Sequence, residues 1–213
     1  MDALKFIAEN RLVAISRKVY GEDLARSAEA IVEGGIRLLE ITFDQADPEC
    51  LKKTGGSIAL VKKLLGDKIC VGAGTVMTKA QAQAARDNGA DFALAPNVDF
   101  EVIHELKRLN LVAVPGAFTP SEIAAAYNEG ADIVKVFPAA NLGVDYIKAI
   151  RGPINHIPLM AVGGVSVDNV RAFLEAGCGS AGIGSNIINN KRAAAGKFDE
   201  ILRSAQEFYS AIH

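Results

Sequence analysis

Lys135 is the only charged residue in the segment Ile133–Pro138, whose sequence is Ile-Val-Lys-Val-Phe-Pro. The β-branched residues on both sides predict a strand, and burial of the amine in that strand would disfavour its charged form and lower the pKa of Lys135. A lysine that is neutral near pH 7 can attack a carbonyl carbon and form a Schiff base. The alternative is an ordinary lysine at a strand edge, whose ammonium group reaches water.

Glu40 is an acid in the mostly apolar segment 37–43, Arg-Leu-Leu-Glu-Ile-Thr-Phe. Because buried acids are normally paired, one interpretation is an ion pair with a cation such as Arg17 or Lys135. A second interpretation is catalytic, because a Schiff-base reaction needs a group that moves protons. One carboxyl group near the lysine can serve both the loss of water from the carbinolamine and the proton transfer at the substrate carbon.

Two glycine turns form a third candidate, in the segments 161–169 (Ala-Val-Gly-Gly-Val-Ser-Val-Asp-Asn) and 182–186 (Gly-Ile-Gly-Ser-Asn). Each turn lies between an apolar run and a polar segment. Backbone N–H groups of such turns, together with helix N-termini, bind anions. The turns predict a site for a phosphate or a carboxylate, and the alternative is tight packing of a helix on a strand.

Apolar runs that predict strands alternate with amphipathic runs that predict helices. Strands are expected at 11–17, 37–43, 69–74, 92–96, 111–116, 133–138, 158–163 and 180–185. Helices are expected at 22–33, 54–65, 78–88, 99–109, 120–129, 143–150, 167–176 and 198–211, after a short preliminary helix at about 1–10. This alternation predicts an α/β fold, a (β/α)8 TIM barrel that forms a single domain over residues 1–213, with an open doubly wound sheet as the alternative.

The predicted helix ends carry a weak internal repeat. The similar segments are 33–41, 88–96, 129–137 and 176–184, and each places a glycine where a helix would end. Glycine adopts the left-handed conformation of a helix C-cap without strain. Thr119 and Glu122, with a proline between them, predict a capping box, and Ser166 and Asp168 are candidate caps. The only long loop is expected at 44–56.

In a barrel of this type the active site lies at the carboxyl ends of the strands. Side chains two residues apart share a face, so Ile133, Lys135 and Phe137 should point the same way. The loops after the seventh and eighth strands, a common phosphate site of this fold, contain the two glycine turns. The residues expected at the strand ends are Arg17, Glu40, Thr75, Pro96, Lys135, Phe137, Gly163, Gly164, Gly184 and Ser185.

Composition narrows the classes of function. The chain has 213 residues, of which 50% are hydrophobic and 23% charged, which is enough to build a sizeable core. Its formal net charge is −2 and it has no basic block, so nucleic acids and anionic membranes are not expected partners. No apolar run is long enough for a membrane span.

The cysteines and histidines point to a cytoplasmic protein without a metal. Cys50, Cys70 and Cys178 are widely spaced and form no Cys-x-x-Cys pair, which argues against a disulfide framework and favours a reducing compartment. The N-terminus lacks the pattern of a signal peptide. The histidines do not have the spacing of metal ligands.

Six segments together resemble a known family. They are Gly-Gly-Ile-Arg-Leu-Leu-Glu-Ile-Thr-Phe, Val-Gly-Ala-Gly-Thr-Val, Leu-Ala-Pro-Asn, Val-Pro-Gly-Ala-Phe-Thr-Pro-Ser-Glu, Val-Lys-Val-Phe-Pro-Ala and Val-Gly-Gly-Val with Gly-Ile-Gly-Ser, in this order over about residues 10–190. The chain resembles the class I aldolases that cleave 2-keto-3-deoxy-6-phosphogluconate (KDPG) and 4-hydroxy-2-oxoglutarate (KHG). The resemblance implies a lyase that yields pyruvate and an aldehyde, either glyceraldehyde 3-phosphate or glyoxylate. It also implies a homotrimer with no metal or organic cofactor.

The resemblance also implies roles for the strand-end residues. Lys135 is the Schiff-base lysine and Glu40 is the general acid and base. Thr75 and Pro96 border the pyruvyl group, and Phe137 packs beside the lysine. The remaining residues match positions at the substrate's distal phosphate or line the same part of the site, and they are Gly163, Gly164, Gly184 and Ser185.

Two positions depart from the family pattern. Many members carry an arginine where this chain has Asp44, but others carry one at the end of the first strand, as Arg17 does. We therefore assign the substrate carboxylate to Arg17, whose planar guanidinium matches a carboxylate. Val162 replaces a threonine that can contact the hydroxylated carbons of the substrate. Aldolases for the galactonate epimer (KDPGal) also have valine there, but generally lack the serine that matches Ser185, so the sequence predicts pyruvate better than the acceptor aldehyde.

Two other functions remain open on the sequence alone. In a sugar-phosphate isomerase or epimerase, Glu40 would be the base and Lys135 would only stabilise an enolate. In a sugar-phosphate sensor, the site would bind a ligand without turnover. Similarity of fold does not separate these functions from an aldolase.

Overall fold

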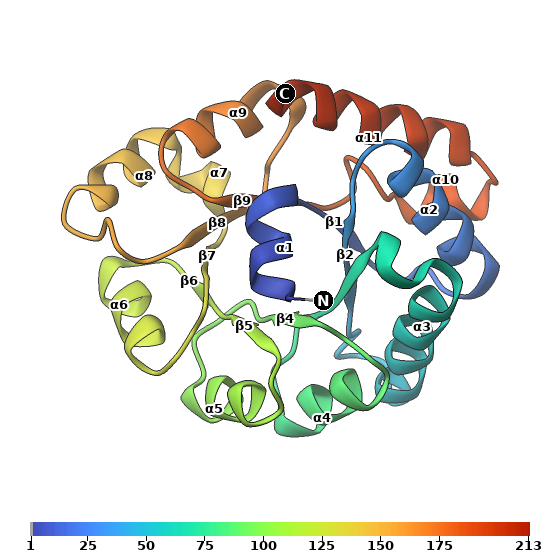
Figure 1. The fold of residues 1–213 in the computed structure, drawn as a ribbon, viewed down its shortest axis with the longest axis horizontal. Helices are drawn as coiled ribbons and strands as arrows, with labels where there is room; N and C mark the ends of the chain where they lie inside the picture. Colours follow the sequence, from blue (N-terminus) through green and yellow to red (C-terminus); the bar gives the residue numbers. More distant parts are fainter. Residues whose placement is uncertain (1) are drawn as a thin grey trace.

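The computed structural model describes residues 2–213 as a ring of parallel strands surrounded by helices (Figure 1). The strands are β1 Leu12–Ser16, β2 Leu38–Thr42, β3 Cys70–Gly74, β4 Phe92–Leu94, β5 Val112–Val114, β6 Gly116–Ala117, β7 Val134–Val136, β8 Leu159–Val162 and β9 Ser180–Ile183. Their order in the sheet is β5-β4-β3-β2-β1-β9-β8-β7-β6, with every pair parallel. The predicted single-domain barrel is therefore the observed fold.

The fifth expected strand, at 111–116, is interrupted in the structure. Its two parts are β5 and β6, which lie at opposite ends of the sheet order and are separated in the chain only by Pro115. Proline has no N–H group and interrupts a ladder of hydrogen bonds. The carbonyl of Pro115 still accepts a hydrogen bond from the backbone N–H of Lys135 at 2.9 Å, so one broken strand joins the two ends of the sheet.

The expected helices are present, with two short additions. The helices are α1 Ala3–Asn10, α2 Gly21–Glu33, α3 Cys50–Leu65, α4 Lys79–Asp87, α5 Phe100–Arg108, α6 Pro120–Asn128, α7 Ala139–Leu142, α8 Val144–Arg151, α9 Val167–Glu175, α10 Asn190–Ala194 and α11 Phe198–Ile212, with a 3-10 turn at Gly66–Lys68. The sequence did not predict α7 or α10. None of the helices in residues 2–213 has both the length and the apolar character needed to cross a bilayer.

The prediction of a long loop at 44–56 is wrong, because α3 already begins at Cys50. The sequence predicts a helix only from residue 54, whereas α3 starts four residues earlier and continues through Gly55 and Gly56. Gly55 lies against Asn88, where a Cβ atom would approach the amide nitrogen to 2.6 Å, so close helix packing explains this glycine. Thr54 is buried and its hydroxyl donates to the carbonyl of Thr42 at 3.3 Å, which anchors the same turn to β2.

The predicted helix ends are observed. Gly35, Gly89, Gly130 and Gly177 follow α2, α4, α6 and α9 with φ angles of 94°, 87°, 99° and 113°, the left-handed region that the repeat predicted. Thr119 and Glu122 form the predicted capping box at the start of α6. At α9 the N-cap is Ser166, whose backbone N–H donates to the Asn169 side chain at 2.9 Å, so Asn169 takes the place expected for Asp168.

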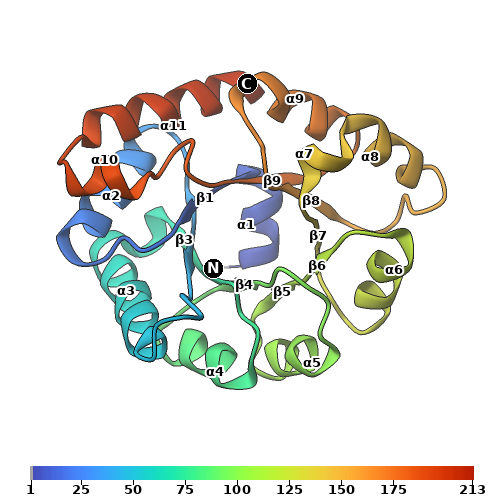
Figure 2. The same ribbon diagram turned by 180° about the vertical axis from the view of Figure 1, so that it is seen from behind.

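The core has two layers because side chains alternate along each strand. One layer packs the outer face of the strands against the helices. The other fills the barrel interior with Ile7, Val13, Ile15, Leu38, Cys70, Phe92, Leu94, Val114, Ile133, Met160 and Val162. Ile7 belongs to α1, which precedes β1 and lies across one end of the barrel (Figures 1 and 2). The amino ends of the strands are therefore covered, and the carboxyl ends carry the candidate site.

Candidate active site

Lys135 lies inside the barrel, as its position in β7 predicts. Its side chain is 3% exposed, with Ile133 before it and Phe137 after it on the interior face. Burial lowers the pKa of Lys135, while the charge of Glu40 opposes this shift and that of Arg17 adds to it. The amine lies 4.7 Å from the centre of the Phe137 ring. These surroundings favour the neutral, nucleophilic form of the amine.

Glu40 lies in β2 and is 1% exposed. Burial raises the pKa of Glu40, and the positive charges of Lys135 and Arg17 oppose the shift. Within residues 2–213 its carboxylate has no hydrogen bond, and no ion pair within 4.0 Å, and its Oε2 atom is buried without a partner. The simple ion pair considered above is therefore not formed, and a buried polar atom without a partner marks a site that a ligand can satisfy.

The two buried groups complement each other chemically. Burial shifts both toward their neutral forms, a free amine at Lys135 and a protonated carboxyl group at Glu40. Opposite shifts of neighbouring groups are typical of acid–base sites. The amine can add to a carbonyl carbon and the carboxyl group can supply the proton that removes water from the adduct.

Glycines on β3 make room for Glu40. Gly74 lies at the carboxyl end of β3, and a Cβ atom there would overlap Oε1 of Glu40. The backbone of β3 thus forms one wall of the carboxylate's position. Gly72, directly opposite Glu40 in the sheet register, leaves space for the ring of Phe92 in the same way.

The close approach at Gly74 predicts a specific defect. Replacing Gly74 with alanine should displace the Glu40 carboxylate and lower the rate of the catalysed reaction by about 100-fold, the effect of a misplacement of about 1 Å. Steady-state kinetics and a thermal melt measure the two consequences separately. Gly56 is the matched control, because a Cβ atom there meets open space. A Gly74→Ala enzyme as active as Gly56→Ala would contradict this account of the wall.

One pocket of about 320 Å³ brings together most of the remaining predicted residues. Its lining consists of Ile15, Arg17, Phe137, Val162, Gly163, Gly164, Val165, Gly182, Gly184, Ser185 and Asn186. The backbone N–H groups of Gly164, Val165 and Ser185 have no acceptor among residues 2–213. Free N–H groups from two loops beside the guanidinium of Arg17 make this pocket suited to an anion.

The first glycine turn needs its glycines. Gly163 and Gly164 have φ angles of 94° and 73°, in the left-handed region that side chains disfavour. A Cβ atom on Gly164 would overlap Ala140, and the N–H of Ala140 donates to the carbonyl of Gly163 at 2.9 Å. Ala140 belongs to α7, so this short helix, which the sequence did not predict, stabilises the turn through this packing contact and this hydrogen bond.

Asn186 is a lining residue that the sequence did not single out. Its side-chain nitrogen donates to the carbonyl of Val165 at 2.8 Å and so joins the loop after β9 to the loop after β8. A single asparagine in a loop carries no sequence signal for such a bond. Ile15 was likewise missed, although it lies two residues before Arg17 on the interior face of β1.

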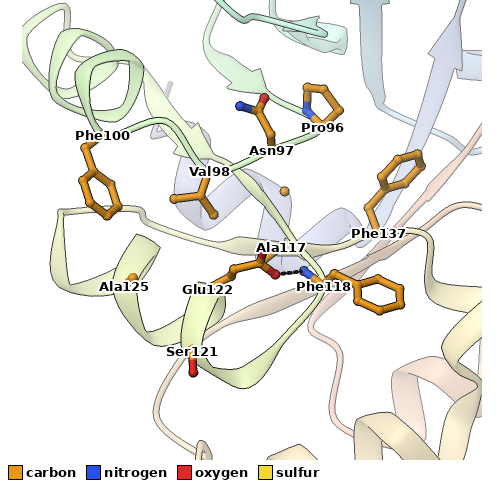
Figure 3. Close-up of a pocket in the computed structure, with 11 residues that line it drawn as sticks. Pro96, Asn97, Val98, Phe100, Ala117, Phe118, Ser121, Glu122, Ala125 and Phe137 are labelled. Carbon is orange, nitrogen blue, oxygen red and sulfur yellow. Dashed lines mark hydrogen bonds between the residues drawn. The ribbon is translucent and has the colours of Figure 1, made fainter.

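A second pocket, of about 580 Å³, is also lined by Phe137 (Figure 3). Pro96 and Phe137 are its predicted site residues, and Asn97 and Phe118 were not predicted. Its lining is Pro96, Asn97, Val98, Phe100, Gly116, Ala117, Phe118, Ser121, Glu122, Ala125 and Phe137. Phe137 lines both pockets, and its ring centre lies 4.7 Å from the amine of Lys135.

Three further positions discussed from the sequence are Thr75, Asp44 and Arg17. Thr75 follows β3, has a φ of 57° and lines neither pocket. Asp44 lies 2.8 Å from the amine of Lys18, and this hydrogen bond holds the pKa of Asp44 below its usual value. Arg17 has no hydrogen bond or ion pair in the described part of the chain and is available to a ligand.

Comparison with known proteins decides the family. A family model described as "Aldolase: KDPG and KHG aldolase" matches residues 4–204. The chain belongs to the KDPG and KHG aldolase family. It is thus an enzyme of the aldolase class, as the sequence predicted.

Members of this family differ in substrate. The 2-dehydro-3-deoxy-6-phosphogalactonate aldolase of Escherichia coli (strain K12) is 32% identical over 177 residues, which cover 83% of this chain and 83% of that protein. The KHG/KDPG aldolase of the same strain is 32% identical over 181 residues, which cover 84% of this chain and 82% of that protein. The percentage of identical residues is the same for both relatives, so it does not indicate which of these substrates the chain uses.

A solved structure adds chemical detail. The KDPG aldolase of Legionella pneumophila, with pyruvate captured at low pH as a covalent carbinolamine intermediate, is 25% identical to this chain. The two structures superpose with a TM-score of 0.81 over 97% of each chain. A carbinolamine is the adduct of an amine and a carbonyl group, which is the chemistry that the buried lysine predicts.

Proposed function

We propose that this aldolase is a class I enzyme that cleaves a 4-hydroxy-2-oxo acid to pyruvate and an aldehyde through a Schiff base on Lys135. The observation that carries the proposal is the buried pair of Lys135 and Glu40, with both pKa values shifted toward the neutral forms. The carbinolamine in the Legionella pneumophila relative supports the same chemistry.

The reaction follows from these two groups. The neutral amine of Lys135 adds to the C2 carbonyl, and the carboxyl group of Glu40 protonates the departing hydroxyl, so that water leaves and an iminium ion remains. The Glu40 carboxylate then accepts the proton of the C4 hydroxyl, the C3–C4 bond breaks, and its electrons move into the iminium. The aldehyde departs, the resulting enamine is protonated at C3, and water releases pyruvate and the free lysine.

The substrate's two anionic ends are assigned to different groups. We assign the carboxylate of the pyruvyl part to Arg17, which lines the pocket of the glycine turns together with Phe137, and we assign Thr75 and Pro96 to the border of the pyruvyl group. The N–H groups around Gly164 and Ser185 hold a distal phosphate, with Gly163 and Gly184 completing the two turns. The phosphate loops support a phosphorylated substrate such as KDPG, and the shorter KHG would leave them empty.

Reduction with borohydride in the presence of pyruvate tests the mechanism. Trapping should add one reduced pyruvyl unit to the protein, and peptide mapping should place it on Lys135. A folded protein that gains no adduct would contradict the imine mechanism. That result would instead favour the sugar-phosphate isomerase or the sensor, in which Lys135 forms no bond to a ligand.

Val162 favours a KDPGal-type substrate as a second candidate. Its apolar side chain lines the anion pocket at the position where KDPG-type relatives place a hydroxyl group. Replacing Val162 with threonine is expected to raise kcat/KM for KDPG relative to KDPGal by about two- to tenfold, the worth of one hydrogen bond. The rate of pyruvate trapping should not change. An unaltered ratio of the two substrates would remove Val162 from the determinants of specificity.

We also infer that the enzyme is a cytoplasmic homotrimer. Phe100 and Phe118 line the second pocket, and their aromatic side chains are 45% and 46% exposed. Exposed apolar side chains that lie close together support contact with another subunit. The free cysteines Cys70 and Cys178, both buried, suit a reducing compartment. Light scattering should give three times the chain mass of 22.5 kDa, and a monomer would overturn the assembly.

A further inference from the structure

Gln81 is a buried polar residue that the mechanism above does not use. It lies in α4 and is 4% exposed. Its Oε1 atom accepts a hydrogen bond from the N–H of Met77 at 2.7 Å, and its Nε2 atom donates to Oε1 of Gln45 at 2.9 Å. Both ends of the buried amide are therefore satisfied, and both partners belong to loops at the carboxyl ends of strands.

Gln45 continues this chain of hydrogen bonds toward the site. It lies in the loop between β2 and α3, and its Nε2 atom donates to the carbonyl of Thr75 at 2.8 Å. The two glutamines thus connect helix α4, the loop after β2 and the end of β3. Gln45 is itself exposed, so its hydrogen bonds fix the position of a loop and do not contribute to the packing of the core.

The backbone of Thr75 has a conformation that is unfavourable for threonine. Its φ of 57° is in the left-handed region, where a β-branched residue is a genuine outlier. Such backbone strain persists only where neighbouring groups impose it, and it gathers at functional sites. The hydrogen bond from Gln45 to the Thr75 carbonyl is one of the contacts that impose it.

The preceding peptide unit borders the catalytic acid, since the Thr75 carbonyl belongs to the Thr75–Val76 peptide and the carbonyl of the Gly74–Thr75 peptide accepts from the N–H of Phe43 at 2.8 Å. Gly74 precedes Thr75, and its Cα position is the wall against which Oε1 of Glu40 lies. A relaxation of the positive φ at Thr75 would shift the adjoining Gly74 backbone that forms this wall and would also redirect the Thr75 side chain. The two glutamines therefore fix a backbone segment shared by Glu40 and by the pyruvyl end of the site.

We propose that Gln45 and Gln81 are positioning residues that hold the backbone of Thr75, and through it the adjoining Gly74–Thr75 peptide, in the geometry required for imine formation, an inference that rests on the proposed function. They act through the backbone and do not touch the substrate. Because they act on the pyruvyl end, their loss slows the reaction of every 2-oxo acid alike. The anion loops around Gly164 and Ser185 are left unchanged.

The variants Gln45→Leu and Gln45→Glu test this role without disturbing the core. Leucine removes both hydrogen bonds of Gln45. Glutamate can still accept from Gln81 but cannot donate to Thr75. The matched control is Gln83→Leu, a glutamine of the same helix as Gln81 whose side chain donates to Asp87 at 2.7 Å, away from the strand ends.

Both Gln45 variants should trap pyruvate with borohydride about tenfold more slowly than the wild-type enzyme and the Gln83→Leu control. Their kcat should fall by the same factor for phosphorylated and unphosphorylated substrates, with an unchanged ratio of kcat/KM between the two. The pH at half-maximal kcat/KM should shift, because Glu40 loses its fixed wall. A merely structural role would lower the melting temperature without moving this pH.

The outcomes separate the two levels of the proposal. Wild-type enzyme that traps pyruvate, with Gln45→Leu trapping at the same rate, would overturn the positioning role and leave the aldolase mechanism intact. A loss confined to phosphorylated substrates would also overturn it. Wild-type enzyme that traps no pyruvate would overturn the mechanism and this inference with it.

Discussion

Replacing Lys135 with alanine is expected to abolish cleavage of every substrate. The amine is the only group in the mechanism that can bond to the C2 carbon, and without the iminium the electrons of the C3–C4 bond have no acceptor. The loss should be on the order of 10⁵- to 10⁶-fold, as when a covalent nucleophile is removed elsewhere. Steady-state cleavage assays and borohydride trapping should both fall to background.

Lys135→Met is the matched control for folding. Methionine fills a similar space without a charge, and the position lies in the barrel interior beside Met160, its register partner on β8. Both variants should keep the far-ultraviolet circular dichroism of the wild type. Residual cleavage above 1% of the wild-type rate in both variants would show that Lys135 is not the nucleophile.

Replacing Glu40 with glutamine should lower kcat by about 10²- to 10⁴-fold, the usual worth of a general acid and base. Glutamine preserves the size of the side chain but can neither give nor take a proton. Slow formation of the pyruvate adduct should remain possible, because Lys135 is still present. The separation of slow trapping from near-complete loss of cleavage distinguishes this variant from Lys135→Ala.

The pH dependence of stability gives an independent check on Glu40. Burial raises its pKa in the folded state above the unfolded value, so the folded protein binds the proton more tightly. The stabilisation is complete below the unfolded pKa and is lost as pH rises through the folded pKa. The melting temperature of Glu40→Gln should therefore rise relative to the wild type as the pH increases above the unfolded pKa, with the full difference reached above the folded pKa. Equal melting temperatures of the two proteins at all pH values would contradict the raised pKa.

The burial of Lys135 and Glu40 inside the barrel could be predicted from the sequence because each of them breaks a local pattern. Lys135 and Glu40 are single charged residues in apolar strands, and strand periodicity alone places Lys135 on the same face as Ile133 and Phe137. The glycine turns were readable for a similar reason, because only glycine tolerates the backbone of Gly163 and Gly164.

The hydrogen bonds that hold the loops around the site could not be predicted, because they join segments that are remote in the sequence. Gln45 and Gln81 are 36 residues apart, and neither lies in a pattern that requires an amide. Asn186 reaches a carbonyl 21 residues away. Local patterns also placed the start of α3 at residue 54 instead of Cys50, and they gave no sign that Gly55 packs against Asn88, where a Cβ atom would not fit.

The covering of one end of the barrel by α1 has a consequence for the sequence of events in turnover. Because Ile7 seals the interior from the amino ends of the strands, reactants and products must use the same mouth at the carboxyl ends. Lys135 is buried beside Phe137, and in the proposed mechanism it holds the three-carbon fragment covalently after bond cleavage. We expect the aldehyde to leave first and pyruvate last, and in synthesis pyruvate to enter first, so that excess aldehyde competes with pyruvate by blocking the passage.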